Sequence, residues 1–155
     1  MAMAATEVVR TLLNDPTNPD VVHRLVAPGA TYVSLNFDNP ELQKIMPWTG
    51  TRTGPDAVLD TYTRVGRFWH SEGFEIEDLF GEGGNVAAFG RFTYRSTTLG
   101  KAVTSPFAIL AKVDDGQITF MQFMEDTFAT ASSFRSGGVT TYRSDPDGGE
   151  VAVPA

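Results

Sequence analysis

The sequence predicts an α+β fold in which a curved antiparallel sheet wraps around N-terminal helices to form a cone. Three observations predict it. The first part of the chain carries apolar residues at helical spacing, and the middle alternates with the period of strands. Val103 to Asp126 then has the pattern of two long strands joined by a tight turn at Asp114 to Gly116. Helices followed by a run of strands are typical of an α+β domain.

Three helices are expected before the long strands. Each begins at a capping residue or a proline and ends near a proline or glycine, the signals that start and stop helices. They are Thr6 to Asn14 with Thr6 as N-cap, a shorter helix from Pro19 capped by Asn18, and a long helix from Pro55 to about Ser71.

The strands are expected to form one meander after a first strand. Their segments are Ala30 to Phe37, Phe74 to Phe80, Val86 to Thr97 and the two halves of the central hairpin. Between them, Asp38 to Gly54 carries Met46 and Trp48, so we expect an ordered loop over something apolar. Those two side chains form either a lid on a ligand or part of the core.

The end of the chain is expected to divide into a last helix and a tail. Thr127 to Phe134 is the predicted helix, and Asp126 either caps it or, after a bulge, faces inward as a catalytic acid. Residues 1–134 then form one domain. Glycine, serine, aspartate and proline dominate residues 135–155, which we expect to be a flexible tail.

Composition limits the classes of function. The 155 residues include 12 basic and 19 acidic ones, a net charge of -7 that disfavours nucleic acid as a partner. No apolar run is long enough for a membrane span, and residues 1–7 lack signal-peptide features, so no membrane and a cytoplasmic location are expected. Cysteine is absent, and His23 and His70 lie on different predicted helices, so no metal site is expected.

Two motifs carry a family resemblance. They are PWTGTRTGPDAV at Pro47 to Val58 and DDGQITFMQFMEDTFATASSF at Asp114 to Phe134. With the order of elements, they resemble the SnoaL-like branch of the nuclear transport factor 2-like superfamily over roughly Thr6 to Phe134. That superfamily includes ketosteroid isomerase, limonene epoxide hydrolase, scytalone dehydratase, polyketide cyclases and non-catalytic proteins, so the resemblance implies the fold and leaves the activity open.

The resemblance also implies which side chains line the cone. Counting residues outward from the two predicted turns gives the same assignment. It places Arg91 beside Ile109 and Ile109 beside Phe123, with Thr93, Phe107 and Glu125 in the next row. The implied interior consists of Tyr32, Ser34, Asn36, Phe89, Arg91, Thr93, Phe107, Ile109, Ala111, Met121, Phe123 and Glu125.

The family's acids are missing from their usual places. Phe123 stands where polyketide cyclases and the epoxide hydrolase have an aspartate, and Ile109 where ketosteroid isomerase has its oxyanion-stabilising acid and the cyclases a histidine. Thr93 replaces the aspartate that pairs with the epoxide hydrolase's arginine, and Ser34 the isomerase's general base. Of the family's machinery, only the arginine, as Arg91, is retained.

Glu125 is the carboxylate expected inside an otherwise apolar cavity, where burial raises a pKa and suits the group to proton transfer. The alternative is an ion pair with Arg91 or Arg95. In the catalytic interpretation, Glu125 moves the proton, Arg91 holds the developing oxyanion, and Tyr32 or Asn36 orients the substrate.

Two functions therefore stay open. The first is a cofactor-independent enzyme that isomerises, cyclises, dehydrates or opens an epoxide in a mostly apolar, oxygen-bearing molecule. The second is a non-catalytic binding or assembly protein. A homodimer is expected through an apolar outer sheet face, predicted to carry Ala88, Phe92, Tyr94, Ala108, Leu110, Phe120 and Met124.

The expected ligand is compact. Phe89, Phe107, Ile109, Met121 and Phe123 would supply an apolar wall beside Trp48, and Arg91 would anchor one ligand oxygen. Because Phe123 occupies a position where relatives keep a small acid, the cavity should suit a terpenoid or single-ring molecule better than a four-ring steroid.

Overall fold

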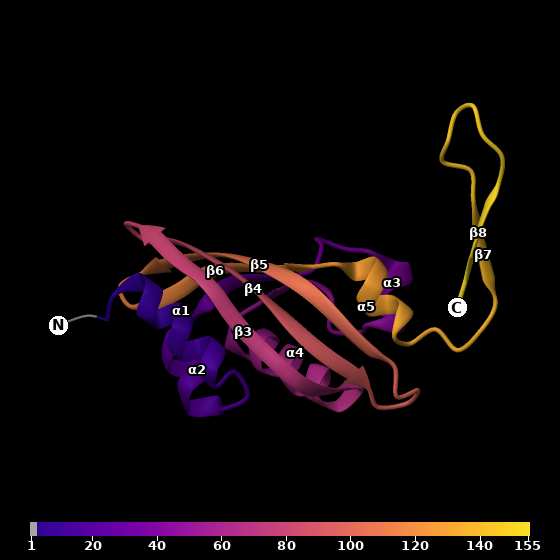
Figure 1. Ribbon diagram of the computed structural model, residues 1–155. Helices are drawn as coiled ribbons and strands as arrows, with labels where there is room; N and C mark the ends of the chain where they lie inside the picture. Colours follow the sequence, from indigo (N-terminus) through magenta and orange to yellow (C-terminus); the bar gives the residue numbers. More distant parts are fainter. Residues whose placement is uncertain (1–2) are drawn as a thin grey trace.

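A computed structural model describes residues 3–155 (Figure 1). Its helices are α1 (Ala5–Asn14), α2 (Pro19–Leu25), α3 (Pro40–Ile45), α4 (Pro55–Phe68) and α5 (Thr127–Ser132). Its strands are β1 (Val26–Ser34), β2 (Gly50–Thr53), β3 (Trp69–Glu82), β4 (Asn85–Ser96), β5 (Ala102–Asp114), β6 (Gln117–Glu125), β7 (Val139–Tyr142) and β8 (Val151–Pro154).

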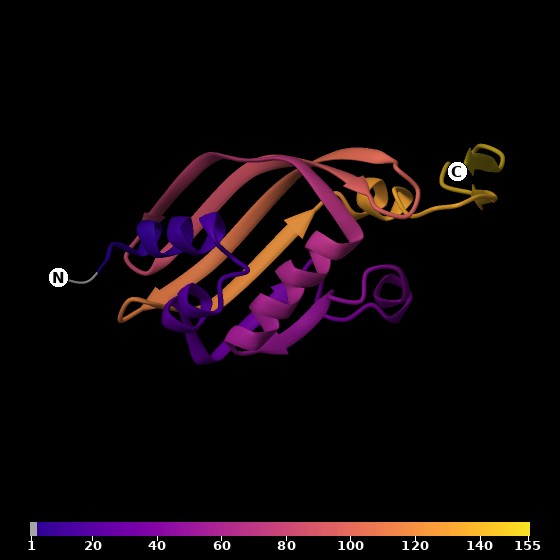
Figure 2. The same ribbon diagram turned by 90° about the horizontal axis from the view of Figure 1, so that it is seen from below.

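The α+β prediction is confirmed: a six-stranded sheet in the order β2-β1-β6-β5-β4-β3 curves around α1, α2 and α4 (Figure 2). All pairs are antiparallel except β1 with β6, which run parallel. The parallel pair follows from the position of β1, which enters the sheet after two helices and not through a hairpin. No helix within residues 3–155 is long and apolar enough to cross a membrane.

The core fills the space between the concave sheet face and the helices. Leu12 on α1 is fully buried, and it belongs to the same apolar cluster as Ala111 and Met121. Met46 and Trp48 are also buried, and the Trp48 ring packs edge-on against Phe68 at 5.1 Å between centroids. Of the two interpretations of these loop residues, the structure supports the core.

The register of the central hairpin is as predicted, because Ile109 pairs with Phe123 and Phe107 with Glu125. The register of β4 against β5 is wrong. Arg91 was predicted beside Ile109 and instead pairs with Pro106, a shift of three positions. Since side chains alternate faces along a strand, an odd shift turns every β4 side chain over.

The shift corrects two sets of predictions. Phe89, Arg91 and Thr93 face outward and not into the cone, whereas Ala88, Phe92 and Tyr94 face inward and do not belong to the outer face. The cause lies in the turn after β4. Arg95 pairs with Ala102, so this turn is centred closer to β4 than the prediction placed it.

Several element boundaries also differ from the prediction. Helix α1 is preceded by Ala4 without a side-chain cap, so Thr6 is not its N-cap. Helix α4 ends at Phe68 because the residues after it pair with β4, which puts His70 on an exposed strand and not at a helix end. The predicted cap at Asn18 is confirmed by bonds from the amides of residues 20 and 21.

At the C-terminal end of the sheet, the Asp126 carboxylate accepts a hydrogen bond from the Ala129 amide at 3.1 Å, so the capping interpretation of Asp126 is confirmed. Beyond α5, the predicted tail contains the two-stranded hairpin β7–β8, which stands away from the main sheet (Figure 1). The flexibility of residues 135–155 and the domain boundary at residue 134 stay predictions.

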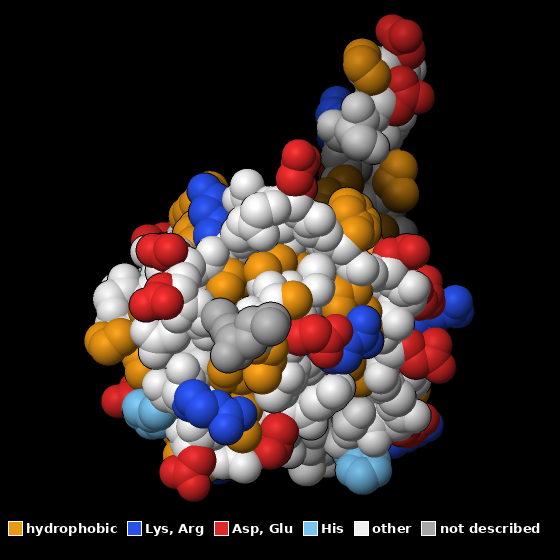
Figure 3. Space-filling model, turned by 90° about the vertical axis from the view of Figure 1, so that its left-hand side faces the viewer, with side chains coloured by type: hydrophobic (Ala, Val, Ile, Leu, Met, Phe, Trp, Pro, Cys, Tyr) orange, Lys and Arg blue, Asp and Glu red, His pale blue; other side chains and the backbone are white. Residues whose placement is uncertain are grey.

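Charges are mixed on the end of the molecule shown in Figure 3. Lys and Arg side chains lie scattered among Asp and Glu, and hydrophobic side chains gather toward the middle of the view. Among the described residues, this face therefore presents no basic stripe of the kind that phosphate backbones require.

Candidate functional site

A small cavity lies where β6 ends, between the concave sheet face and α4. Its volume is about 20 Å³, room for about one water-sized molecule. It is lined by Tyr32, Ser34, Trp48, Thr61, Tyr62, Val65, Trp69, Phe92, Tyr94, Phe123 and Glu125.

Glu125 is the acid of this cavity. Its Oε2 atom is buried and has no hydrogen-bond partner within the described residues. Burial raises the pKa of Glu125 to about 7, the neighbouring Thr130 hydroxyl acts to lower it, and the charge of Asp126 adds to the rise. A carboxyl group with such a pKa can both give and accept a proton near neutral pH.

Three tyrosines share the cavity with Glu125. Burial raises the pKa of Tyr32, Tyr62 and Tyr94 above the ordinary phenol value, so all three stay neutral and can donate hydrogen bonds. The Tyr62 hydroxyl is buried without a hydrogen-bond partner, although it lies close enough to Tyr32 for the two to influence each other's pKa. Together these phenols can stabilise an oxygen on which negative charge develops.

A cation beside this cluster is Arg52, which was not among the predicted site residues. Its Nη1 donates to Asp60 at 2.7 Å, and its Nη2 donates to the cavity residue Thr61 at 2.7 Å. The Arg52 hydrogen bond is the main reason why the pKa of Asp60 falls. Arg52 pairs with Tyr32 across β1 and β2, and its charge acts to lower the Tyr32 pKa.

Five of the predicted site residues line the cavity: Tyr32, Ser34, Trp48, Phe123 and Glu125. Phe107, Ile109 and Met121 are buried on the same sheet face, farther along the core. Asn36 does not line the cavity, although its buried Oδ1 has no partner.

Arg91, Phe89 and Thr93 lie outside. Arg91 is 63% exposed and pairs with Glu77, Phe89 is 47% exposed, and the Thr93 hydroxyl bonds with that of Thr104. The predicted alternative for Glu125, an ion pair with an arginine of β4, is wrong for the same reason. The ion-pair partners of both arginines are glutamates of β3: Arg91 pairs with Glu77, and Arg95 pairs with Glu72 at 2.5 Å.

Two of the tyrosines that line the cavity were missed for different reasons. Tyr62 lies on the long helix at the spacing of its apolar residues, where its hydroxyl gives no periodic signal. Tyr94 was assigned to the outer face by the wrong β4 register, and the correct pairing would have identified it.

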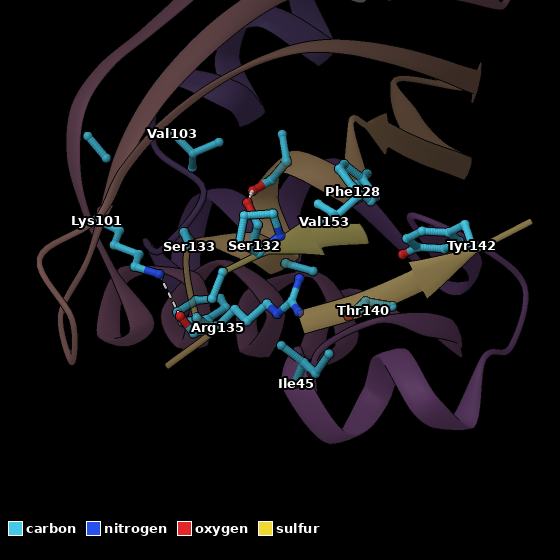
Figure 4. A pocket seen from close by; sticks show the side chains of 16 residues that line it. Ile45, Lys101, Val103, Phe128, Ser132, Ser133, Arg135, Thr140, Tyr142 and Val153 are labelled. Carbon is cyan, nitrogen blue, oxygen red and sulfur yellow. Dashed lines mark hydrogen bonds between the residues drawn. The ribbon is translucent and has the colours of Figure 1, made fainter. Parts of the chain in front are cut away.

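A second, larger hollow lies beside α5 and the start of β5, where the β7–β8 hairpin passes (Figure 4). Its volume is about 770 Å³, and apolar side chains such as Val103, Phe128 and Tyr142 line much of it. Lys101 Nζ donates to the Arg135 carbonyl oxygen at 2.5 Å across it. No carboxylate side chain lines this hollow, so it lacks the proton-transferring group of the first cavity.

Within residues 3–155, no cluster of three or more His, Asp or Glu side chains is arranged to hold a metal ion.

Residues 8–121 match the family model of the SnoaL-like domain. Patulin synthesis protein F of Aspergillus clavatus is 52% identical over 148 residues, which cover 92% of this chain and 75% of that protein. Patulin biosynthesis cluster protein F of Penicillium expansum is 49% identical over 144 residues, covering 89% of this chain and 72% of that protein.

Solved structures share the fold at low identity. An NTF2-like protein from Burkholderia thailandensis superposes with a TM-score of 0.72 and 20% identity, covering 86% of this chain and 98% of that one. A putative SnoaL-like polyketide cyclase from Jannaschia sp. gives 0.70 and 18%, covering 85% and 92%.

Proposed function

Because this chain belongs to the SnoaL-like domain family, we propose that it is a cofactor-independent enzyme of small-molecule metabolism in which Glu125 transfers a proton. The observation that carries the proposal is the Glu125 carboxyl group, whose Oε2 atom is buried without a hydrogen-bond partner among residues 3–155 and whose pKa is raised to about 7. An unpaired buried acid costs folding free energy, so its presence is better explained by chemistry than by stability.

The substrate is a mostly apolar molecule that carries one reacting oxygen. Glu125 gives a proton to that molecule or takes one from it, while the neutral phenols of Tyr32, Tyr62 and Tyr94 donate hydrogen bonds to the oxygen. Isomerisation, cyclisation, dehydration and epoxide opening can each include such a proton transfer. The tyrosines take the role that the sequence analysis gave to Arg91.

The names of two relatives support this class of function. Both are named for patulin synthesis or its gene cluster, and both share about half of their aligned residues with this chain. We infer that this chain also acts on a small molecule in a biosynthetic route.

Titration of Glu125 tests the proposal. With ¹³C-labelled glutamate, the carboxyl resonance that disappears in Glu125→Gln should titrate near pH 7. A midpoint near the ordinary value of about 4.5 would remove the support for proton transfer.

The alternative is a non-catalytic binding or assembly protein of the same fold. The observation that favours it is the cavity volume of about 20 Å³, which is too small for a substrate unless side chains move. A Glu125 that titrates normally would favour this alternative.

We also propose that the protein forms a homodimer through the outer sheet face. Phe80, Phe89, Leu110 and Met124 are 43 to 58% exposed there, and the Phe80 and Phe89 rings stack at 6.3 Å. Such a patch is typical of a subunit interface. Sedimentation at micromolar concentration should give a dimer, and Leu110→Lys should give a monomer; a wild-type monomer would contradict the proposal. A cytoplasmic location stays a prediction.

A further inference from the structure

A surface hollow of about 210 Å³ lies directly outside the Glu125 cavity. Its outer rim comes from the α1–α2 loop, the last turn of α4 and the start of β3, with Pro16, Thr17, Gly66, His70 and Ser71 as lining residues. Its floor consists of Tyr62, Val65, Trp69 and Tyr94, and these same four residues line the inner cavity. The hollow and the cavity are therefore separated by one layer of side chains.

The members of that layer are held unequally. Trp69 is fixed, because its Nε1 donates to Ser133 at 2.9 Å and its ring stacks on Phe134 at 4.8 Å. Tyr94 stacks on Phe92 at 4.3 Å. Tyr62 is half-buried, stacks on no aromatic ring in the described residues, and has a hydroxyl without a hydrogen-bond partner. Rotation of the Tyr62 side chain would therefore break no hydrogen bond of its hydroxyl.

We propose that this hollow is the entrance and outer subsite of the Glu125 cavity, with Tyr62 as the movable part of the wall and Gly66 as the residue that keeps the hollow open. The inference rests on the proposed function and adds to it the route and the size of the ligand. An engineered cavity of roughly 150 Å³ holds benzene. A hollow of about 210 Å³ therefore suits a molecule of one ring, whose oxygen would reach Glu125 once Tyr62 turns.

Gly66 is the feature of the hollow that packing does not explain. It lies near the end of α4, and glycine inside a helix costs about 1 kcal/mol relative to alanine. No neighbour requires the missing side chain, because an added Cβ would meet no atom within 4 Å. A side chain at this position would project into open space at the rim of the hollow, so glycine leaves the passage clear.

The size of residue 66 gives a test that needs no known substrate. A water-soluble carbodiimide activates a protonated carboxyl group, and added taurine then displaces the urea to leave an amide, which mass spectrometry locates on the Glu125 peptide. Gly66→Leu should slow the labelling of Glu125 roughly tenfold, which corresponds to about 1.4 kcal/mol on the barrier. Gly66→Ala should slow it less.

Gly73→Leu is the matched control, because its added Cβ also meets no atom within 4 Å and Gly73 does not line the hollow. Labelling of the exposed Glu41 should be equal in all variants. The proposal that the hollow is the entrance would be contradicted if Glu125 were labelled equally in Gly66→Leu and wild type. It would also be contradicted if Glu125 were labelled in no variant. Either result could occur while Glu125 still titrates near pH 7, so it would leave the proposed function standing.

Discussion

The two ends of the concave sheet face differ in the polarity of the side chains that they bury. Beneath α1, the core of the described chain is an apolar cluster in which Leu12, Ala111, Ile118 and Met121 are buried together. Near α5, the same face buries the Glu125 Oε2 atom together with phenols and hydroxyls. Along β6, Ile118 near the start packs in the apolar core, whereas Glu125 at the end belongs to the polar cluster.

The difference is one of free energy. At the α5 end, Glu125 Oε2, Tyr62 Oη and Thr130 Oγ1 are all buried without hydrogen-bond partners in the part of the chain that the structure describes. Each such group costs about 1–3 kcal/mol relative to a paired one. The α1 end must supply the stability that offsets this cost. The apolar end therefore stabilises the fold, and the groups that we propose for proton transfer lie at the other end.

The largest expected effect comes from weakening the α1 end. Leu12→Ala should lower the free energy of unfolding by about 2–5 kcal/mol, because it leaves a cavity among fully buried neighbours. Urea denaturation measures it. Glu125→Gln is the matched change at the other end, and it should leave stability at pH 7 unchanged or higher. A loss as large as that of Leu12→Ala would mean that Glu125 is structural.

The pH dependence of stability should separate the two ends further. The folded pKa of Glu125 is about 7, above its ordinary value of 4.5, so between these values the native state keeps a proton that the unfolded chain releases. Stability should therefore fall as pH rises from 4.5 to 7, by about 3 kcal/mol in all, since each pH unit costs about 1.4 kcal/mol.

Denaturation midpoints of wild type and Glu125→Gln across this range measure that contribution, since the substitution removes it. Parallel curves for the two proteins would contradict the raised pKa. Leu12→Ala should keep the wild-type slope and only lower the whole curve, because it changes no titratable group.

The sequence predicted one of the two central strand registers correctly and the other wrongly. The β5–β6 register was predictable, because Gly116 marks a short turn and its φ of 75° is one that glycine adopts readily. That register placed Glu125 inside. The β4–β5 turn carries no such precise marker: Gly100, with φ of 68°, lies beyond the turn's centre, and centring the turn there moved the pairing by three positions.

The polar cluster was predictable only where the register was right. Tyr32 and Glu125 were placed correctly because each lies on a strand whose inward face was identified. Tyr94 and Arg91 were each assigned to the wrong sheet face, because the predicted centre of the β4–β5 turn was wrong. Arg52 was overlooked because the short strand β2 was read as part of a loop.

The smallest expected effect concerns Arg91, which the family resemblance favours and the structure excludes from the cavity. Arg91→Ala should leave the denaturation midpoint and the Glu125 titration unchanged, because the guanidinium is largely exposed and its partner Glu77 is a surface residue. Arg52→Ala is the contrasting variant. It removes hydrogen bonds to Asp60 and Thr61 beside the cavity, so it should lower the denaturation midpoint. It should also raise the pKa of Tyr32, which the Arg52 charge acts to lower. If Arg91→Ala shifted the Glu125 titration, the outward orientation of Arg91 on β4 would be wrong, and Arg91 would belong to the site after all.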